Sequence, residues 1–144
     1  MGDKWQDPVV AVINSHDDVV EMLRTAFEQA GMIVVSAHAD RIKRGDTSLA
    51  DFVKEHKPSV IVYDLVPPYD RSWRFVEHLR HSDLLMGYRF VLTSTNAQKA
   101  QELSGTSEDV FEILGKPYDI DLLTRAVKEA SRARPTRDLS HQER

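Results

Sequence analysis

Residues 60–68 read VIVYDLVPP, and this stretch decides the fold. Its first four residues are β-branched or aromatic, which is typical of a strand buried on both faces of a sheet. Asp64 follows this run directly. Pro67 and Pro68 have no N–H to donate to a neighbouring strand, so the strand must end before them. The stretch therefore predicts a buried strand that delivers Asp64 to the edge of a sheet.

Similar apolar runs recur on both sides of this strand, at Val9–Ile13, Ile33–Val35, Phe90–Leu92 and Val110–Leu114. Between these runs, apolar residues recur at helical spacing. We expect a helix closed by Gly31, one with Leu49, Phe52 and Val53 on its buried face, one capped by Ser72, one over Ala97–Leu103 and one capped by Asp119. The segment RIKRGD, residues 41–46, is predicted to be a basic loop, and Trp73 a packing residue.

Five strands that alternate with about five helices predict an α/β fold, a doubly wound parallel sheet with helices on both faces. In such folds, functional residues gather at the carboxyl ends of the strands. We assign residues 1–7 to an N-terminal extension, 8–132 to a single domain and 133–144 to a polar tail that we expect to be disordered.

The composition restricts the classes of function. The chain of 144 residues has 23 acidic and 19 basic residues, for a net charge of −4, which gives no reason to expect a nucleic acid or an anionic membrane as partner. It has no cysteine, so disulfides and thiolate chemistry are excluded. No apolar run approaches the length of a membrane span and no signal peptide is present, so we predict a cytoplasmic protein.

Polar residues stand where four of the predicted strands end: Asn14, Ser15, Asp64, Thr93, Ser94 and Lys116. In a parallel sheet these ends lie side by side. A carboxylate between a hydroxyl and an ammonium group could accept a phosphoryl group, because the hydroxyl would hydrogen-bond its oxygens and the ammonium would offset their charge.

Four segments resemble the response-regulator receiver family: HDDVVEMLRTAFEQAG (16–31), VIVYDLVPP (60–68), FVLTS (90–94) and LGKPYD (114–119). The resemblance covers roughly residues 8–131. It implies a flavodoxin-like (βα)5 fold with strand order 2-1-3-4-5, Asp64 as phosphoacceptor, and Thr93 and Lys116 as phosphate-binding and switch residues. It also makes Pro117 a candidate for a cis peptide bond.

The acidic pocket departs from the family pattern. The family's first strand ends in two acidic residues that hold Mg²⁺, and here those positions are Asn14 and Ser15. Mg²⁺ prefers anionic oxygen ligands. Each lost carboxylate removes up to about 4 kcal/mol of electrostatic attraction for a unit positive charge at ~4 Å. Asp17 and Asp18 are alternative acids that could reach inward, although carboxylates in a first helical turn are also favoured by the helix dipole, and Ser15 with Asp18 can form a capping pair.

A second departure lies in the fifth strand. The family's aromatic switch residue would fall at Ile113, whereas Phe111 stands two residues earlier. His78 and His81 have a spacing that could bring both to one metal ion, but a solvated helix face is the simpler interpretation.

We therefore predict a receiver-like signalling module of a two-component or phosphorelay system. It has no catalytic activity of its own, binds a protein partner, and shows weak or absent Mg²⁺-dependent phosphorylation. The alternative is a conventional receiver that a histidine kinase phosphorylates on Asp64. A flavodoxin-like enzyme or cofactor binder is a third hypothesis, disfavoured because no Gly-rich phosphate loop is present. We expect no attached output domain, and the resemblance leaves open a homodimer through the face formed by the fourth helix, fifth strand and fifth helix.

Overall fold

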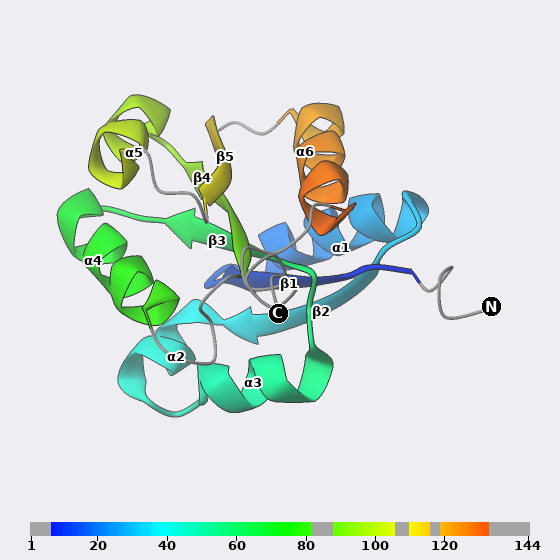
Figure 1. Ribbon diagram of the computed structural model, residues 1–144, viewed down its shortest axis with the longest axis horizontal. Coiled ribbons are helices and arrows are strands. Elements are labelled where there is room, and N and C mark those ends of the chain that lie inside the picture. Colours follow the sequence, from blue (N-terminus) through cyan, green and yellow to red (C-terminus); the bar gives the residue numbers. More distant parts are fainter. Residues whose placement is uncertain (1–6, 82–87, 106–109, 116–118, 133–144) are drawn as a thin grey trace, which may run out of the picture.

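The computed structural model describes residues 7–81, 88–105, 110–115 and 119–132. Strands and helices alternate along the chain (Figure 1), in the order β1 (Val9–Asn14), α1 (Asp17–Gln29), β2 (Ile33–His38), α2 (Ala39–Arg44), α3 (Leu49–His56), β3 (Val60–Leu65), α4 (Tyr69–Arg80), β4 (Arg89–Ser94), α5 (Ala97–Ser104), β5 (Val110–Gly115) and α6 (Ile120–Arg132). Each predicted strand is present and is extended by one to three residues.

The strands form one parallel sheet in the order β2-β1-β3-β4-β5. The predicted fold class and strand order are therefore confirmed. The pairing of β4 with β5 contains a register shift at Phe90/Val91. All four pairings carry the strands in one direction, so their carboxyl ends meet at a single edge of the sheet.

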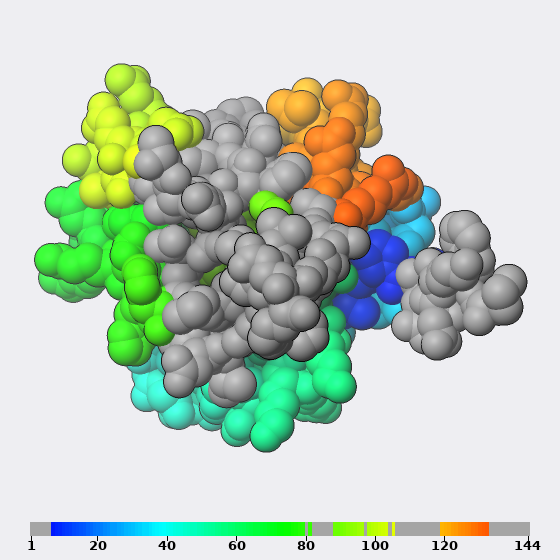
Figure 2. Space-filling view, viewed as in Figure 1, coloured from blue at the N-terminus to red at the C-terminus, as the bar shows by residue number. Residues whose placement is uncertain are grey.

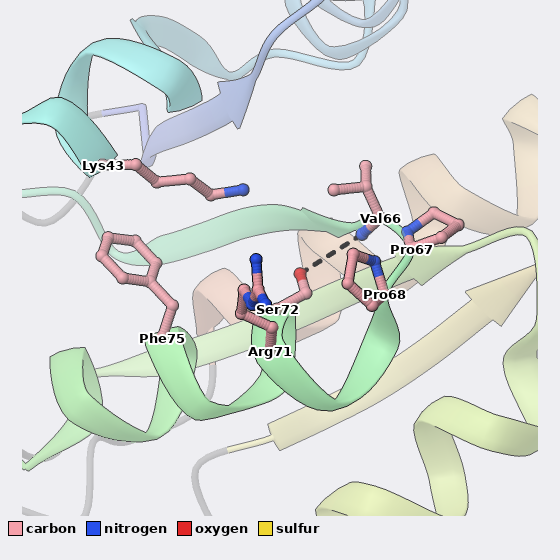
Figure 3. Close-up of a pocket in the computed structure, with 7 residues that line it drawn as sticks. All are labelled: Lys43, Val66, Pro67, Pro68, Arg71, Ser72 and Phe75. Atoms are coloured by element: carbon pink, nitrogen blue, oxygen red, sulfur yellow. Dashed lines mark hydrogen bonds between the residues drawn. The ribbon is translucent and has the colours of Figure 1, made fainter.

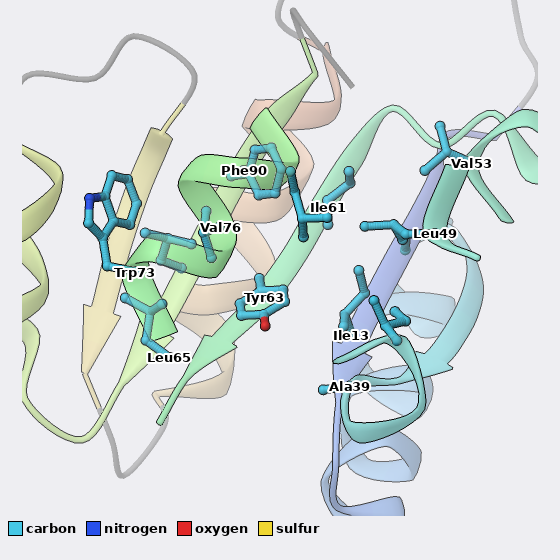
Figure 4. Packing of buried hydrophobic residues seen from close by; sticks show 14 of the residues in the cluster. Ile13, Ala39, Leu49, Val53, Ile61, Tyr63, Leu65, Trp73, Val76 and Phe90 are labelled. Carbon is cyan, nitrogen blue, oxygen red and sulfur yellow. The ribbon is translucent and has the colours of Figure 1, made fainter. Parts of the chain in front are cut away.

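Two apolar cores lie on opposite faces of the sheet, because successive side chains of a strand point to opposite faces. Helices α2, α3, α4 and α5 pack on one face, over strand residues that include Ile13, Ile61 and Tyr63 (Figure 4). Helices α1 and α6 pack on the other, over residues that include Val12 and Val62. In the space-filling view, α5 and α6 occupy separate upper corners of the molecule and α3 its lower edge (Figure 2).

Helix α1 ends as its sequence predicts. Gly31 has a φ of 89°, a left-handed conformation that glycine adopts without steric cost. Its N–H bonds to the carbonyl of Glu28, and the N–H of Met32 bonds to that of Phe27. This pair of bonds is a Schellman motif. The start of the helix differs from the prediction, because its N-cap is His16 and no side chain caps it. The proposed Ser15–Asp18 capping pair is therefore not formed.

The prediction of a basic loop over RIKRGD was wrong, because residues Ala39–Arg44 form helix α2. Ala39 and Ile42, spaced i and i+3, are buried against the core. Gly45 closes the helix in a left-handed conformation with φ 84°. The basic residues occupy the last turn, where cations are stabilised by the helix dipole. The charge cluster that favoured a loop therefore stabilises the end of a helix.

Helix α4 also begins earlier than predicted, at Tyr69, with Pro68 as its N-cap. The backbone N–H of Ser72 already bonds to the carbonyl of Pro68, so Ser72 lies inside the helix rather than at its cap. Its hydroxyl accepts a hydrogen bond from the N–H of Val66 at 3.2 Å. The predicted cap of the last helix is confirmed, since the Asp119 carboxylate accepts the N–H of Leu122 at 3.1 Å.

Candidate functional site

Three of the predicted site residues lie buried at the carboxyl ends of neighbouring strands. Asn14 ends β1, Asp64 is the fifth residue of β3, and Thr93 is the fifth residue of β4. Their exposed fractions are 4%, 6% and 1%. Each continues the alternation of side chains that face α1 and α6, represented by Val12 and Val62. One face of one sheet edge therefore carries an amide, a carboxylate and a hydroxyl.

Asp64 and Thr93 are joined directly. They are register partners in the pairing of β3 with β4, and the Thr93 hydroxyl donates to Oδ1 of Asp64 at 2.6 Å. Hydrogen bonds to an ionised acceptor are shorter and stronger than neutral ones, and burial strengthens this one further. The contact holds the carboxylate in one orientation at the end of β3.

Ser94 and Lys116 are two further predicted strand-end residues of this sheet edge. Ser94 is buried, and its hydroxyl accepts the N–H of Asn96 at 3.0 Å, so it shapes the turn into α5. Strand β5 ends at Gly115, the register partner of Ser94. Lys116 and Pro117 follow in the sequence and lie outside the described residues. The X-Pro cis peptide bond that the described residues do contain is Pro67–Pro68.

Asn14 has a local hydrogen bond of its own. Its side-chain carbonyl accepts the N–H of His16 at 2.9 Å, closing the turn between β1 and α1. Ser15, the next residue, is half-buried. The polar pair Asn14 and Ser15 therefore includes one side chain whose oxygen already accepts a backbone N–H.

Asp17 and Asp18 are both exposed in the first turn of α1. The Asp18 carboxylate accepts the N–H of Val19 at 3.0 Å, a contact within the helix itself. In this conformation neither acid is buried beside Asp64, and their role as compensating ligands stays a prediction.

The described side chains at this strand end form a poor ligand set for Mg²⁺. Within the described ranges, no group of three His, Asp or Glu side chains is arranged to hold a metal ion. The strand end supplies one carboxylate, from Asp64, and an amide oxygen that already accepts a backbone N–H. Mg²⁺ loses its water reluctantly and requires hard anionic ligands in return. His78 and His81 are exposed on α4, and His81 contacts the carbonyl of its own helix at Glu77.

Two contacts that the sequence did not predict join the loops around this edge. The hydroxyls of Tyr69 and Thr95 hydrogen-bond to each other, linking the start of α4 to the loop after β4. Lys99 of α5 lies 3.8 Å from Asp70 of α4. These contacts depend on how the two loops fold back, for which a strand-and-helix pattern carries no signal.

Tyr63 is a further unpredicted feature. Its side chain is 1% exposed, and its hydroxyl has no hydrogen-bond partner within the part of the chain that the structure describes. Burial raises the pKa of the phenol, and the nearby carboxylates of Asp64 and Asp40 raise it further. The phenol therefore stays protonated at pH values well above those at which an exposed tyrosine ionises. Trp73, predicted to be a packing residue, is buried in the same core. The side chains of Phe111 and Ile113 lie outside the described residues.

The fold is similar to those of several solved receiver domains. A signal receiver domain of a two-component histidine kinase from Clostridium thermocellum matches with a TM-score of 0.70 and 14% identity, over 88% of this chain and 99% of that chain. Chemotaxis protein CheY4 of Vibrio cholerae matches with a TM-score of 0.68 and 17% identity, over 86% and 98%. A response regulator from Thermotoga maritima matches with a TM-score of 0.68 and 16% identity, over 88% and 99%.

These likenesses establish the receiver-domain fold, and at such identities they establish the fold alone. No protein-family model matches the sequence, and no match was found among curated proteins. None of the helices in the described ranges is long and apolar enough to cross a membrane.

Proposed function

We propose that this chain is a receiver-like signalling module that acts by binding a protein partner, and that Mg²⁺-dependent phosphorylation of Asp64 is weak or absent. The observation that carries the proposal is the composition of the strand-end site. Asp64 lies at the carboxyl end of β3 and is hydrogen-bonded by Thr93, the two positions at which the family resemblance implies the phosphoacceptor and the switch hydroxyl, yet Asn14 and Ser15 stand where the family has acids. The fold is that of receiver domains and Asp64 stands at the acceptor position that the resemblance implies, whereas the residues at the two cation-ligand positions are neutral.

The electrostatics of the site support this proposal. A phosphoryl group brings about two negative charges at neutral pH, and adding it to a buried carboxylate position requires nearby positive charge. In the conventional family arrangement a divalent cation supplies much of that charge. With neutral side chains at positions 14 and 15, a cation would gain little on entering the pocket. The same electrostatic deficit therefore disfavours both Mg²⁺ binding and phosphoryl transfer.

The second candidate is a conventional receiver, and the Thr93–Asp64 hydrogen bond is the observation in its favour. In that case an oxygen of the Asp64 carboxylate would attack the phosphorus of a phosphohistidine. The P–N bond would break, and the imidazole would leave with its electron pair. The candidate histidine kinase is then an upstream donor and not merely a binding partner.

Treatment with a small phosphodonor separates the two candidates. The purified chain and its Asp64→Asn variant are incubated with acetyl phosphate, with and without Mg²⁺, and analysed by intact-mass spectrometry. We expect no phosphoryl adduct on either protein beyond trace level. Near-stoichiometric labelling of the wild type, absent from the variant and dependent on Mg²⁺, would establish the conventional receiver and refute the proposal.

Partner binding needs its own measurement. A tagged chain and its Asp64→Asn variant are purified from the cells that express them, and the co-purifying proteins are compared. The proposal predicts that both forms retain the same partner with equal yield. Retention by the wild type only would show that binding depends on the phosphorylated carboxylate.

The family resemblance leaves self-association open, and the surface that it would use corresponds here to α5, β5 and α6. Leu122 on α6 is a large apolar side chain that is 41% exposed and therefore available for a contact. Sedimentation across a concentration series tests this prediction, with Leu122→Ser as the variant that should weaken a dimer.

A further inference from the structure

A cavity of about 250 Å³ lies beside the loop that follows β3 (Figure 3). It opens between helix α2, the loop after β3 and the first two turns of α4. Val66, Pro67, Pro68 and Phe75 provide most of its wall. Asn14, Asp64 and Thr93 are not among the residues that line this cavity, although the loop after β3 adjoins both places.

Two cations point into this cavity. Lys43 extends from α2 and Arg71 from α4, and Figure 3 shows both charged groups reaching into the space above Phe75 and Ser72. Among the residues that the structure describes, neither Lys43 nor Arg71 forms an ion pair. Neighbouring cations do: Arg44 pairs with Asp46 at 3.1 Å, and Lys99 lies 3.8 Å from Asp70. The cavity therefore combines apolar walls with two cationic side chains that form no ion pair with a described acid.

We propose that the cavity binds a small organic carboxylate, with its apolar body against the proline and phenylalanine wall and its carboxylate between Lys43 and Arg71. Two like charges at one mouth repel each other, and an anion between them gains from both. The Arg71 guanidinium presents paired N–H donors that match the two oxygens of a carboxylate.

The volume sets the size of the ligand. An apolar cavity of ~150 Å³ is sufficient for benzene, whereas sites for drug-sized ligands begin at about 300 Å³. The cavity here lies between these limits. It therefore suits a body of about one ring with a short acidic arm. The Ser72 hydroxyl, which lines the cavity, is held by the N–H of Val66, so that wall is already ordered before a ligand binds.

The test uses 3-phenylpropionate as the probe, followed by two-dimensional NMR of the isotope-labelled chain. We expect chemical-shift changes centred on the backbone amides of Val66, Ser72 and Phe75. The dissociation constant should be on the order of millimolar, the range for a ligand of about eleven non-hydrogen atoms. The neutral isostere 3-phenylpropanamide should bind about tenfold more weakly, because it lacks the charge.

A matched pair of variants tests the two cations. Lys43→Gln/Arg71→Gln should weaken 3-phenylpropionate binding about tenfold, whereas Arg44→Gln/Arg74→Gln should leave it unchanged. Both variants remove the same net charge from the same two helices, and Arg44 and Arg74 do not line the cavity. No shift changes at about 20 mM probe, equal binding of the amide, or equal weakening by the control pair would each overturn the proposal. None of these readouts involves Asp64, so the outcome is independent of the proposed signalling function.

Discussion

Replacing Asn14 and Ser15 by aspartate should create a Mg²⁺-dependent stability that the wild-type chain lacks. Strands β1 and β3 are adjacent, and Ile13 is the register partner of Tyr63. A carboxylate at position 14 would therefore stand one strand spacing, about 5 Å, from the buried Asp64. At an effective dielectric of about 20, two like charges at ~5–6 Å repel by about 3 kcal/mol. Solvent screens the repulsion between Asp64 and a carboxylate at the half-buried position 15. We therefore expect a total destabilisation of about 1–3 kcal/mol without metal.

Mg²⁺ should reverse this loss in the double variant. Three carboxylates would surround the cation, and a dissociation constant of about 0.1 mM at ~10 mM Mg²⁺ corresponds to about 2.7 kcal/mol of stabilisation. For a chain of this length, that free energy raises the melting temperature by roughly 10 °C. The wild-type melting temperature should change little over the same titration.

Thermal melts across the Mg²⁺ titration provide the assay, with the triple variant Asn14→Asp/Ser15→Asp/Asp64→Asn as control. Removing the third carboxylate should abolish most of the Mg²⁺-dependent rise. A double variant whose melting temperature does not change with Mg²⁺ concentration would refute the reasoning. It would mean that restoring two carboxylates is not sufficient to form a Mg²⁺ site. A wild-type chain that Mg²⁺ stabilises to the same degree would show that Asp17 or Asp18 already serves as a ligand.

Three further predictions follow from the buried polar groups. Thr93→Ala should reduce the free energy of unfolding by about 1.5–3 kcal/mol, as measured by urea denaturation, because it removes the hydroxyl that donates to Asp64. Thr93→Ser keeps a hydroxyl and should restore most of that free energy. Tyr63→Phe should stabilise the protein by about 1 kcal/mol, because the Tyr63 hydroxyl is buried without a hydrogen-bond partner among the described residues. A loss of stability in the same assay would mean that an ordered water hydrogen-bonds to that hydroxyl. Since the pKa of Tyr63 is raised in the folded state, the unfolded chain loses this proton first as pH rises. Stability should therefore fall above about pH 10, by up to about 1.4 kcal/mol per pH unit, and Tyr63→Phe should reduce that fall.

The sheet was predictable because its signals are local and redundant. Each strand is a short β-branched run bounded by polar residues, glycine or proline, which predicts a parallel α/β sheet, whereas the strand order came from the resemblance to receiver domains. The proximity of Asp64 and Thr93 follows from the same rule, since adjacent parallel strands bring their carboxyl ends together.

Errors arose where a helix lacked the usual signals. Helix α2 buries Ala39 and Ile42 from a span of six residues, too short for helical periodicity to stand out from its charges. Helix α4 begins after Pro68, which offers no side-chain oxygen for an N-cap, and the prediction placed the cap at Ser72, one turn inside the helix. The cavity was equally hidden, because Lys43 and Arg71 line it from two helices that are well separated in the sequence.

The substitution of the two acids is physically consistent with the hydrogen bonds at the strand end. A receiver that keeps all three carboxylates carries mutual repulsion that a bound cation relieves. In this chain Asp64 accepts a hydrogen bond from Thr93, while Asn14 accepts one from His16. Neither contact requires a metal, and a neutral amide at position 14 adds no like charge beside the buried Asp64. The strand end can therefore hold one conformation without a cation. A module that binds its partner in that single conformation would need neither Mg²⁺ nor phosphorylation, which is why the neutral pair supports the interaction-module proposal over the conventional receiver.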